Sequence, residues 1–391
     1  MNGQTQASYF STNDCDVTDL ETIINQSQDR DAVPYAYDIQ KNVPLYDMAK
    51  LRPLLTETDA RRAIMGEWGR VLLSGAGIIV LKQAYADTVV LDEATKIYED
   101  IIAAEKESAA QGADHFAAAG ANDRVWNSLQ KLCERDPEVF LRYFANTSVA
   151  AACEAWLGPN YQMTAQVNLV YPGGAAQQAH RDYHLGFQTE EEVAKYPAHA
   201  HDLSPLLTLQ GAIAHCDMPL ESGPTKLLPF SQLYRAGYAA WRRTDFRTLF
   251  EDRYIQLPLA KGDALFFNPA VFHAAGANTS KDIHRLANLM QIGSAMGRVL
   301  EAVDRKALCK RVYPHALKAC QTGSLTGPEL AAAIAATAEG YPFPTSLDRD
   351  PPVGGLAPES QQAYMLRALN EDISDADFHA HLDMMSDKQR A

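Results

Sequence analysis

The pattern of hydrophobic and polar residues divides the chain into three parts. In the first part, apolar residues such as Ile64, Trp68 and Leu72 recur at helical spacing, and Gly75 ends the run. This spacing predicts helices that bury one face against a core. The elements expected here are helices from residue 56 to Gly75, at 88–109 and at 137–157, a strand at 78–81, and a mobile loop rich in Ala and Gly at 109–121.

The second part begins after Gly158 and has the pattern of strands. From residue 162 to 171, apolar and polar residues alternate, which is the period of a strand with one buried face. Shorter apolar runs follow and are separated by Gly and Pro, as in a β-sandwich or jelly roll. These runs cover 206–214, 226–228, 254–257, 263–267 and 285–292.

The third part returns to helical spacing. Helices are expected at 299–320, 326–337 and 359–385, with a connector rich in Pro and Gly at 341–358. The whole pattern predicts an α+β protein with a mainly β core and flanking helices at both ends. We expect an N-terminal arm (1–55), a central domain (56–298) with a helical layer (56–157) and a β core (158–298), and a helical C-terminal extension (299–391).

Composition narrows the classes of partner. The chain has 49 acidic and 35 basic residues and a net charge of −14, which disfavours nucleic acid and anionic lipid because phosphates bind basic surfaces. No apolar run reaches the roughly 20 residues that cross a membrane, and the N-terminus lacks the features of a secretory signal. Six cysteines without Cys-x-x-Cys pairs argue against a zinc ribbon or a disulfide framework. We therefore expect a cytoplasmic protein with no nucleic-acid or membrane partner.

One group of residues has the composition of a metal site. His180 and Asp182 are two residues apart after a Pro-Gly-Gly turn, so in an extended segment their side chains point the same way. His273 follows a later apolar run and can supply a third ligand from a neighbouring strand. Two imidazoles and one carboxylate leave coordination positions open, as in non-haem Fe(II) sites that activate O2 beside a co-substrate.

The same motif occurs elsewhere in the chain, so the residues alone leave the ligand choice open. His-x-Asp also appears at His215/Asp217 and at His381/Asp383. The pair at 381 lies in a helical tail with no later histidine, which is typical of a solvated face. The pair at 215 ends a predicted strand and precedes His273, and it competes directly with His180/Asp182.

A candidate anion-binding residue follows the third histidine. Arg285 lies on the apolar run at 285–292, twelve residues after His273. A guanidinium in an apolar pocket binds a carboxylate through two parallel hydrogen bonds.

Taken together, these motifs resemble the phytanoyl-CoA dioxygenase family, over about residues 60–295. That family consists of Fe(II)- and 2-oxoglutarate-dependent oxygenases on a double-stranded β-helix, a cupin-like jelly roll. The resemblance implies this fold for the β core and the choice of His180/Asp182 over His215/Asp217. The motifs that carry it are Gly158-Pro-Asn160, Pro172-Gly173, His180-Arg-Asp182, the turn from Glu221 to Ser231, Gly262-Asp263, His273 and Arg285.

The resemblance also assigns roles residue by residue. His180, Asp182 and His273 match the iron ligands, and Arg285 matches the arginine that binds the distal carboxylate of 2-oxoglutarate. Four polar residues are further candidates for contact with this co-substrate: Gln177 and Thr225, which match family positions, and Gln166 and Asn168 on the preceding strand. Tyr183, His184 and Phe187 adjoin the ligands and are candidates for contact with the substrate.

The predicted activity is oxidation of a small organic molecule with Fe(II), 2-oxoglutarate and O2. Hydroxylation of a C–H bond, with release of succinate and CO2, is favoured over halogenation because halogenating relatives replace the carboxylate that Asp182 retains. The alternative is a non-catalytic cupin-like module that binds a metal or a ligand. The C-terminal helices are candidates for a lid or for a contact in a homo-oligomer.

Overall fold

A computed structural model describes residues 7–107 and 121–391 of the chain. The loop expected at 109–121 therefore lies outside the described residues except for Ala121. The helices are α1 (Val17–Ile24), α2 (Met48–Leu51), α3 (Thr58–Ser74), α4 (Val89–Glu107), α5 (Ser128–Arg135), α6 (Pro137–Phe144), α7 (Thr147–Leu157), α8 (Glu190–Val193), α9 (Ala198–Leu203), α10 (Gly237–Ala240), α11 (Thr244–Arg253), α12 (Arg305–Thr322), α13 (Gly327–Thr337), α14 (Gln361–Asn370) and α15 (Asp375–Gln389).

The strands form one large and one small sheet. They are β1 (Asp38–Gln40), β2 (Val43–Asp47), β3 (Ile78–Lys82), β4 (Asn122–Val125), β5 (Gln162–Val170), β6 (Thr208–Ala214), β7 (Lys226–Leu228), β8 (Ala264–Phe267), β9 (Phe272–Ala274) and β10 (Arg285–Gly293). Eight strands make a sheet in the order β1-β2-β3-β8-β6-β10-β5-β4, and β7 pairs with β9. The predicted α+β class with a β-rich core is confirmed at this level.

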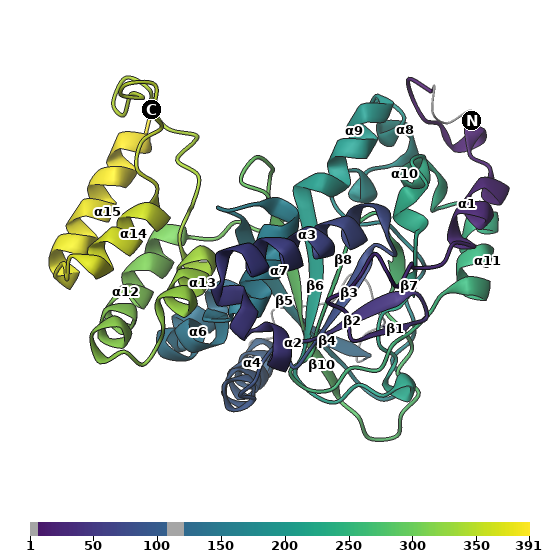
Figure 1. Ribbon diagram of the computed structural model, residues 1–391, viewed down its shortest axis with the longest axis horizontal. Coiled ribbons are helices and arrows are strands. Elements are labelled where there is room, and N and C mark those ends of the chain that lie inside the picture. Colours follow the sequence, from purple (N-terminus) through teal and green to yellow (C-terminus); the bar gives the residue numbers. More distant parts are fainter. Residues whose placement is uncertain (1–6, 108–120) are drawn as a thin grey trace.

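The large sheet lies between helices and the small sheet (Figure 1). One face packs on α3 to α7 and α13 through buried residues such as Val167, Met290 and Phe266. The other face packs on the small sheet through residues such as Leu227, Leu265 and Val271. A further apolar cluster covers the outer side of the small sheet with α1, α10 and α11. The space between the two sheets is therefore separated from solvent by helices on the outer side of each sheet.

Both faces of β5 are buried, which corrects the prediction of a strand with one solvated face. The apolar residues face the helices, as expected. The alternating polar residues Thr164, Gln166 and Asn168 are also buried and face the space between the sheets. Buried polar side chains must be hydrogen-bonded or must serve a ligand. The polar half of the alternation therefore lies in the interior, between the two sheets, and not on the surface of the molecule.

Two predicted helices are each broken into two. The segment 137–157 forms α6 and α7, because the Asn146 side chain accepts hydrogen bonds from the backbone N–H groups of Ser148 and Val149 and so begins a new helix. The segment 359–385 forms α14 and α15, and the Ser374 side chain caps the second of them. The run at 254–257 is not a strand and makes a single bridge from Ile255 to Leu227.

Helices α1 and α15, the first and last of the described chain, lie on opposite sides of the sheets (Figure 1). The segment predicted as an N-terminal arm contributes β1 and β2, and β2 pairs in parallel with β3. Helices α12 to α15 pack on one another, and α12 and α13 also contact α5, α6 or α7. All six cysteines are free. Within the described part of the chain, no helix has the length and apolar character needed to cross a membrane.

Candidate active site

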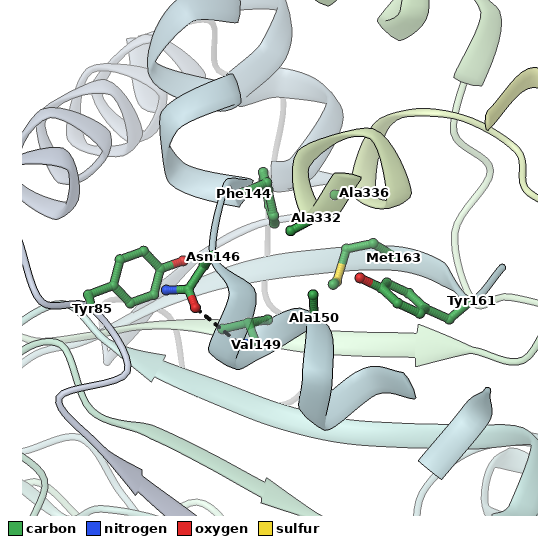
Figure 2. Close-up of a pocket in the computed structure, with 9 residues that line it drawn as sticks. All are labelled: Tyr85, Phe144, Asn146, Val149, Ala150, Tyr161, Met163, Ala332 and Ala336. Atoms are coloured by element: carbon green, nitrogen blue, oxygen red, sulfur yellow. Dashed lines mark hydrogen bonds between the residues drawn. The ribbon is translucent and has the colours of Figure 1, made fainter. Parts of the chain in front are cut away.

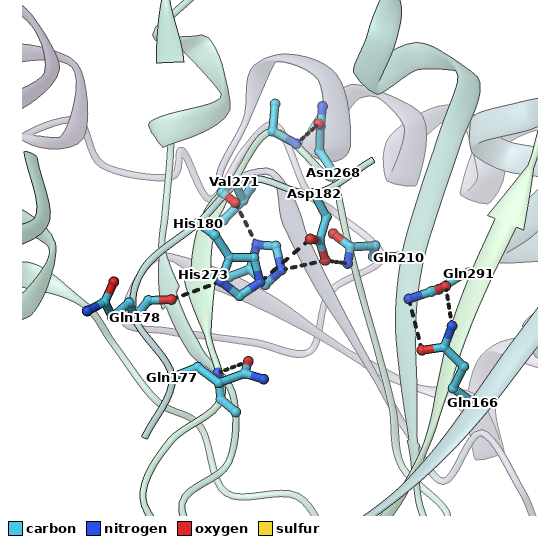
Figure 3. Close-up of polar contacts among 12 residues, drawn as sticks. Gln166, Gln177, Gln178, His180, Asp182, Gln210, Asn268, Val271, His273 and Gln291 are labelled. Atoms are coloured by element: carbon cyan, nitrogen blue, oxygen red, sulfur yellow. Dashed lines mark hydrogen bonds and ion pairs between the residues drawn. The ribbon is translucent and has the colours of Figure 1, made fainter. Parts of the chain in front are cut away.

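His180, Asp182 and His273 converge in the space between the two sheets (Figure 3). His180 and His273 are paired across an antiparallel bridge, with backbone N···O distances of 3.0 and 3.1 Å in the two directions. Directly paired residues share a face, as do residues two apart in an extended segment. Strand register therefore brings three side chains together from positions more than ninety residues apart.

The ligating atoms have the spacing of a site for one metal ion. They all lie within 4.8 Å of one another. Asp182 Oδ2 is 3.3 Å from His273 Nε2, and Asp182 Oδ1 is 3.7 Å from His180 Nε2. The side chains are 15%, 6% and 23% exposed for Asp182, His273 and His180, so the group is enclosed but accessible. Imidazole nitrogens and a carboxylate oxygen at these positions can hold Fe(II) with coordination positions left open.

Backbone carbonyls fix the orientation of both imidazoles. The Nδ1 atom of His180 is 2.9 Å from the carbonyl oxygen of Gln178, and that of His273 is 2.9 Å from the carbonyl of Val271. A carbonyl only accepts, so each Nδ1 carries the proton and donates it. The Nε2 atoms are then unprotonated and directed toward Asp182, which is the arrangement in which histidine binds a metal.

The carboxylate of Asp182 is held in its charged form. Burial acts to raise its pKa, but the positive charge that the nearby His180 and His273 imidazoles carry when they are protonated, together with a hydrogen bond from Gln210, outweighs burial and holds the pKa below its ordinary value. Burial lowers the pKa of His180. A negative carboxylate and a neutral imidazole are the forms that bind a divalent cation.

The competing pair His215/Asp217 is not part of this group. His215 is buried on the helix-facing side, where its Nδ1 lies 2.8 Å from Thr95 Oγ1 and its Nε2 lies 2.8 Å from Tyr143 Oη. Burial lowers its pKa to about 3. Asp217 accepts a hydrogen bond from the backbone of Lys261. His215 is therefore a core histidine with both nitrogens engaged.

The third pair is also engaged elsewhere. His381 stacks on Tyr364, and Asp383 pairs with Lys306 and Lys310. Within residues 7–107 and 121–391, the group at 180, 182 and 273 is the one cluster of three or more His, Cys, Asp or Glu side chains close enough to hold a metal ion.

A cavity of about 120 Å³ is lined by Arg285 and by Gln177 and Ala275, which belong to the segments that carry His180 and His273, but none of the three triad residues lines it. Arg285 is 6% exposed and donates from Nη1 to the carbonyl oxygens of Ser222 and Gly276. Burial lowers its pKa to about 10, so the group stays cationic near neutral pH. No carboxylate of the described residues forms an ion pair with it. A buried cation without an anionic partner favours an anionic ligand in the cavity.

Two of the four polar residues predicted to contact the co-substrate line this cavity. Asn168 and Gln177 are among its walls, together with Ala121, Asn122, Val170, Gly174, Ala175, Ala176 and Ala275. The other two residues do not line the cavity. Gln166 is fully buried and exchanges hydrogen bonds with Gln291. Thr225 is half-buried and directly precedes β7 in the sequence. The roles expected of Gln166 and Thr225 stay predictions.

The three residues predicted to contact substrate lie around the loop that follows Asp182. Tyr183 and His184 have φ angles of +59° and +44°, which are strained for residues with side chains and typical of functional sites. The Tyr183 hydroxyl is buried without a hydrogen-bond partner among the described residues, and its ring contacts Phe187, which is exposed. His184 lies 3.2 Å from Thr208 through its Nε2. The ring of Trp241 also lies edge-on to that of His180.

A second hollow lies on the opposite side of the large sheet and is not part of the site. Figure 2 shows its lining, which comes from the junction of α6 and α7, from β5 and from α13. Its walls are mostly apolar, with Tyr85, Phe144 and Met163 among them, and none of the predicted site residues lines it.

Arg181, which lies between His180 and Asp182 in the sequence, anchors their segment to the turn at 231–234. Its side chain is buried, donates to the carbonyl oxygens of Ser231 and Tyr234, and lies over the rings of Tyr238 and Phe272. A Cβ atom on Gly237 would lie 1.9 Å from the guanidinium carbon, so this contact requires glycine. The sequence gives no sign of this role, because alternation alone places residue 181 on the face away from the metal.

We expect Arg181→Met to destabilise the protein by about 2–4 kcal/mol, because two buried carbonyls lose a charged donor. Thermal unfolding followed by circular dichroism measures the loss. Lys195→Met is the control, since Lys195 pairs with Glu192 at the surface, and its melting temperature should not change. An unchanged melting temperature for Arg181→Met would contradict the anchoring role.

The sequence did not single out Gln210 as part of the site. Its amide Nε2 lies 2.6 Å from Asp182 Oδ2 (Figure 3). Gln210 is a polar residue inside the apolar run at 206–214, and this break in the apolar pattern is the feature of the sequence that could have indicated a role in the site. Arg124 on β4 donates a hydrogen bond to Gln166 and is paired with Asn168, so it lies on the same face of the sheet.

Comparison with known proteins places the chain in a family. The family model described as phytanoyl-CoA dioxygenase matches residues 73–287. The dioxygenase trt7 of Aspergillus terreus (strain NIH 2624 / FGSC A1156) is 23% identical over 217 residues, which are 55% of this chain and 68% of that protein. The dioxygenase andF of Emericella variicolor is 27% identical over 139 residues, which are 34% of this chain and 43% of that protein.

Solved structures with some similarity are also found. The non-heme alpha-ketoglutarate-dependent epimerase SnoN from nogalamycin biosynthesis has a TM-score of 0.42 and 19% identity, with 60% of this chain and 84% of that chain covered. EvdMO1 has a TM-score of 0.42 and 15% identity, with 59% and 50% covered. The family model spans more than half of the chain and includes His180, Asp182 and His273. The chain therefore belongs to the phytanoyl-CoA dioxygenase family and is a 2-oxoglutarate-dependent non-haem iron oxygenase.

Proposed function

We propose that the two sheets form a double-stranded β-helix around the site. Four segments lie side by side on the small-sheet side, because His180 bridges to His273 on β9, and Leu227 on β7 bridges to Ile255. Opposite them lie β8, β6, β10 and β5 of the large sheet. Two facing layers of four antiparallel segments are the arrangement of a jelly roll.

The proposed metal ligands are His180, Asp182 and His273, and the proposed co-substrate site is the cavity beside them. The observation that carries this proposal is the placement of Arg285 in a cavity whose wall continues the ligand segments. Gln177 and Ala275 line the cavity, pair through their backbones at 2.9 Å, and belong to the same two segments as His180 and His273. A dicarboxylate in this cavity would have one end near the ligands and the other at the guanidinium.

Each residue then has a defined task. Fe(II) with 2-oxoglutarate and O2 supplies a two-electron oxidation of a C–H bond, coupled to formation of succinate and CO2. Arg285 neutralises the distal carboxylate of the co-substrate, and the amides of Asn168 and Gln177 offer hydrogen bonds along the cavity. The two imidazoles bind through Nε2 while their Nδ1 protons stay on the carbonyls of Gln178 and Val271.

The proposed reaction is hydroxylation of a small organic molecule. The retained carboxylate of Asp182 supports hydroxylation over halogenation, since the ligand position stays filled. We place the substrate at the rim formed by Tyr183, His184 and Phe187, because this loop adjoins Asp182 and holds a buried hydroxyl without a partner among the described residues. The division of the chain at residue 298, a cytoplasmic location and self-association stay predictions from the sequence.

Anaerobic reconstitution tests the proposal. We expect protein with Fe(II) and 2-oxoglutarate to show the weak visible charge-transfer band of the chelated co-substrate. Admission of O2 should then release succinate, slowly without substrate and faster with a matching compound from a panel of small molecules. Asp182→Ala is the control and should show neither signal. A folded protein that shows no band and releases no succinate would overturn the proposed function.

A further inference from the structure

The three proposed ligands differ in how their orientation is fixed. Backbone carbonyls hold both imidazoles at Nδ1. The carboxylate of Asp182, in contrast, receives a hydrogen bond from a side chain, that of Gln210 on β6, at 2.6 Å. A short hydrogen bond to a charged acceptor is stronger than one between neutral groups. The position of the third ligand therefore depends on a residue outside the ligand motif.

Strand register points Gln210 at the site. Gln210 is 6% exposed and pairs with Phe267 on β8 and Gln291 on β10, so these three side chains share the face toward the small sheet. The ring of Phe267 packs edge-on against the imidazole of His273, with 4.8 Å between centroids. Neighbouring residues on one face of the sheet therefore contact both ligands: Gln210 on β6 reaches the carboxylate, and Phe267 on β8 reaches the adjacent imidazole.

A second contact from β6 holds the adjoining loop. Thr208, two residues before Gln210 on the same face, lies 3.2 Å from His184. The two contacts, at Asp182 and at His184, flank a strained stretch of backbone. Tyr183 and His184 have positive φ angles, a conformation that persists only when neighbouring residues stabilise it. The two polar side chains of β6 thus secure the segment that carries Asp182 at both of its ends.

The environment of Gln210 also argues against a role in packing alone. Its Oε1 atom is buried and has no hydrogen-bond partner among the described residues. An unpaired buried carbonyl costs roughly 1–3 kcal/mol, so an apolar side chain would suit this interior strand position better if packing were the whole requirement. The amide N–H toward Asp182 is the contact that accounts for a glutamine here.

We propose that Gln210 is a positioning residue that fixes the Asp182 carboxylate for metal binding. Its hydrogen bond occupies Oδ2 and leaves Oδ1 for the metal, which sets one defined orientation of the ligand. The inference rests on the proposed function, since it requires the metal at His180, Asp182 and His273. Loss of a hydrogen-bond partner behind a metal ligand typically weakens metal binding by about 10- to 100-fold.

Anaerobic titration with Fe(II) alone tests this role. Gln210→Met keeps the length and bulk of the side chain but removes the donor, and we expect its Fe(II) dissociation constant to rise by about 10- to 100-fold. Gln291→Met is the matched control, because Gln291 lies opposite Gln210 on the neighbouring strand but bonds to Gln166 instead of a ligand. Its affinity for Fe(II) should stay within about threefold of the unaltered protein.

A second readout separates positioning from a loss of fold. Co(II) absorption reports the coordination of the ion, and the Co(II) spectrum of Gln210→Met at saturation should differ from that of both the unaltered protein and Gln291→Met. If Gln210→Met lacks a cooperative thermal transition, Gln210→Leu, which is also apolar and removes the donor without adding a charge, takes its place with the same expected loss.

The results distinguish this inference from the proposed function. Unaltered affinity and spectrum in Gln210→Met overturn the positioning role and leave the metal site intact. Equal losses in Gln210→Met and Gln291→Met also overturn it, since they would indicate a general effect of the polar layer. Absence of Fe(II) binding in the unaltered protein contradicts the proposed function itself.

Discussion

Replacing His180 with alanine is expected to abolish Fe(II) binding and turnover, whereas His215→Ala should keep both. His180 supplies one of three converging ligand atoms, and two remaining ligands cannot hold the ion in a defined site. The loss should exceed the roughly 10- to 100-fold that follows from disturbing a residue behind a ligand. Iron content after anaerobic reconstitution and desalting, together with succinate release, measures both effects.

His215→Ala is a demanding control because it also removes a buried histidine from an His-x-Asp motif. The substitution should lower the free energy of unfolding by about 2–4 kcal/mol, because Thr95 and Tyr143 lose their hydrogen-bond partner and a cavity forms in the core. Iron binding should survive in the fraction that folds. If His215→Ala loses iron while His180→Ala retains it, the assignment of His180 as a ligand is wrong.

Part of the geometry of the candidate triad is encoded locally in the sequence. Residues two apart in an extended segment share a face, so spacing makes His180 and Asp182 a candidate pair, His273 follows a later apolar run, and the family resemblance favours this pair over His215/Asp217. The choice against His215 could not be made from spacing, because both motifs end an apolar run. Tertiary packing separates the two pairs: His215 faces the helices, where Tyr143 and Thr95 occupy both of its nitrogens.

Local patterns also fail to show long-range packing, which explains the errors in the predicted fold. Alternation in β5 correctly predicts a strand, but it does not say that the polar face is covered by a second sheet, which depends on residues a hundred positions away. Apolar periodicity continues through Asn146, so only the cap formed by its side chain ends α6 and begins α7. Periodicity therefore predicts the type of an element better than its ends or its surroundings.

Arg285→Leu is expected to weaken 2-oxoglutarate binding by about 100-fold, or about 3 kcal/mol, with Fe(II) binding retained. The guanidinium is the buried cation of the cavity, and its loss removes the charge-assisted hydrogen bonds available to the distal carboxylate. Titration of 2-oxoglutarate into the anaerobic Fe(II) protein, followed by the charge-transfer band, measures the change. Arg285→Lys keeps the charge without the planar pair of donors and should bind with intermediate affinity.

A co-substrate analogue shows whether the effect arises at the distal carboxylate. 2-Oxopentanoate has the same oxo-acid group but a methyl end, so it should bind the unaltered protein weakly and Arg285→Leu about equally well. The substitution should thus erase the preference for 2-oxoglutarate while leaving the metal chelate in place. Because Arg285 also donates to Ser222 and Gly276, some loss of melting temperature is expected. Unchanged discrimination between the two acids in a folded Arg285→Leu protein would refute the role of this arginine.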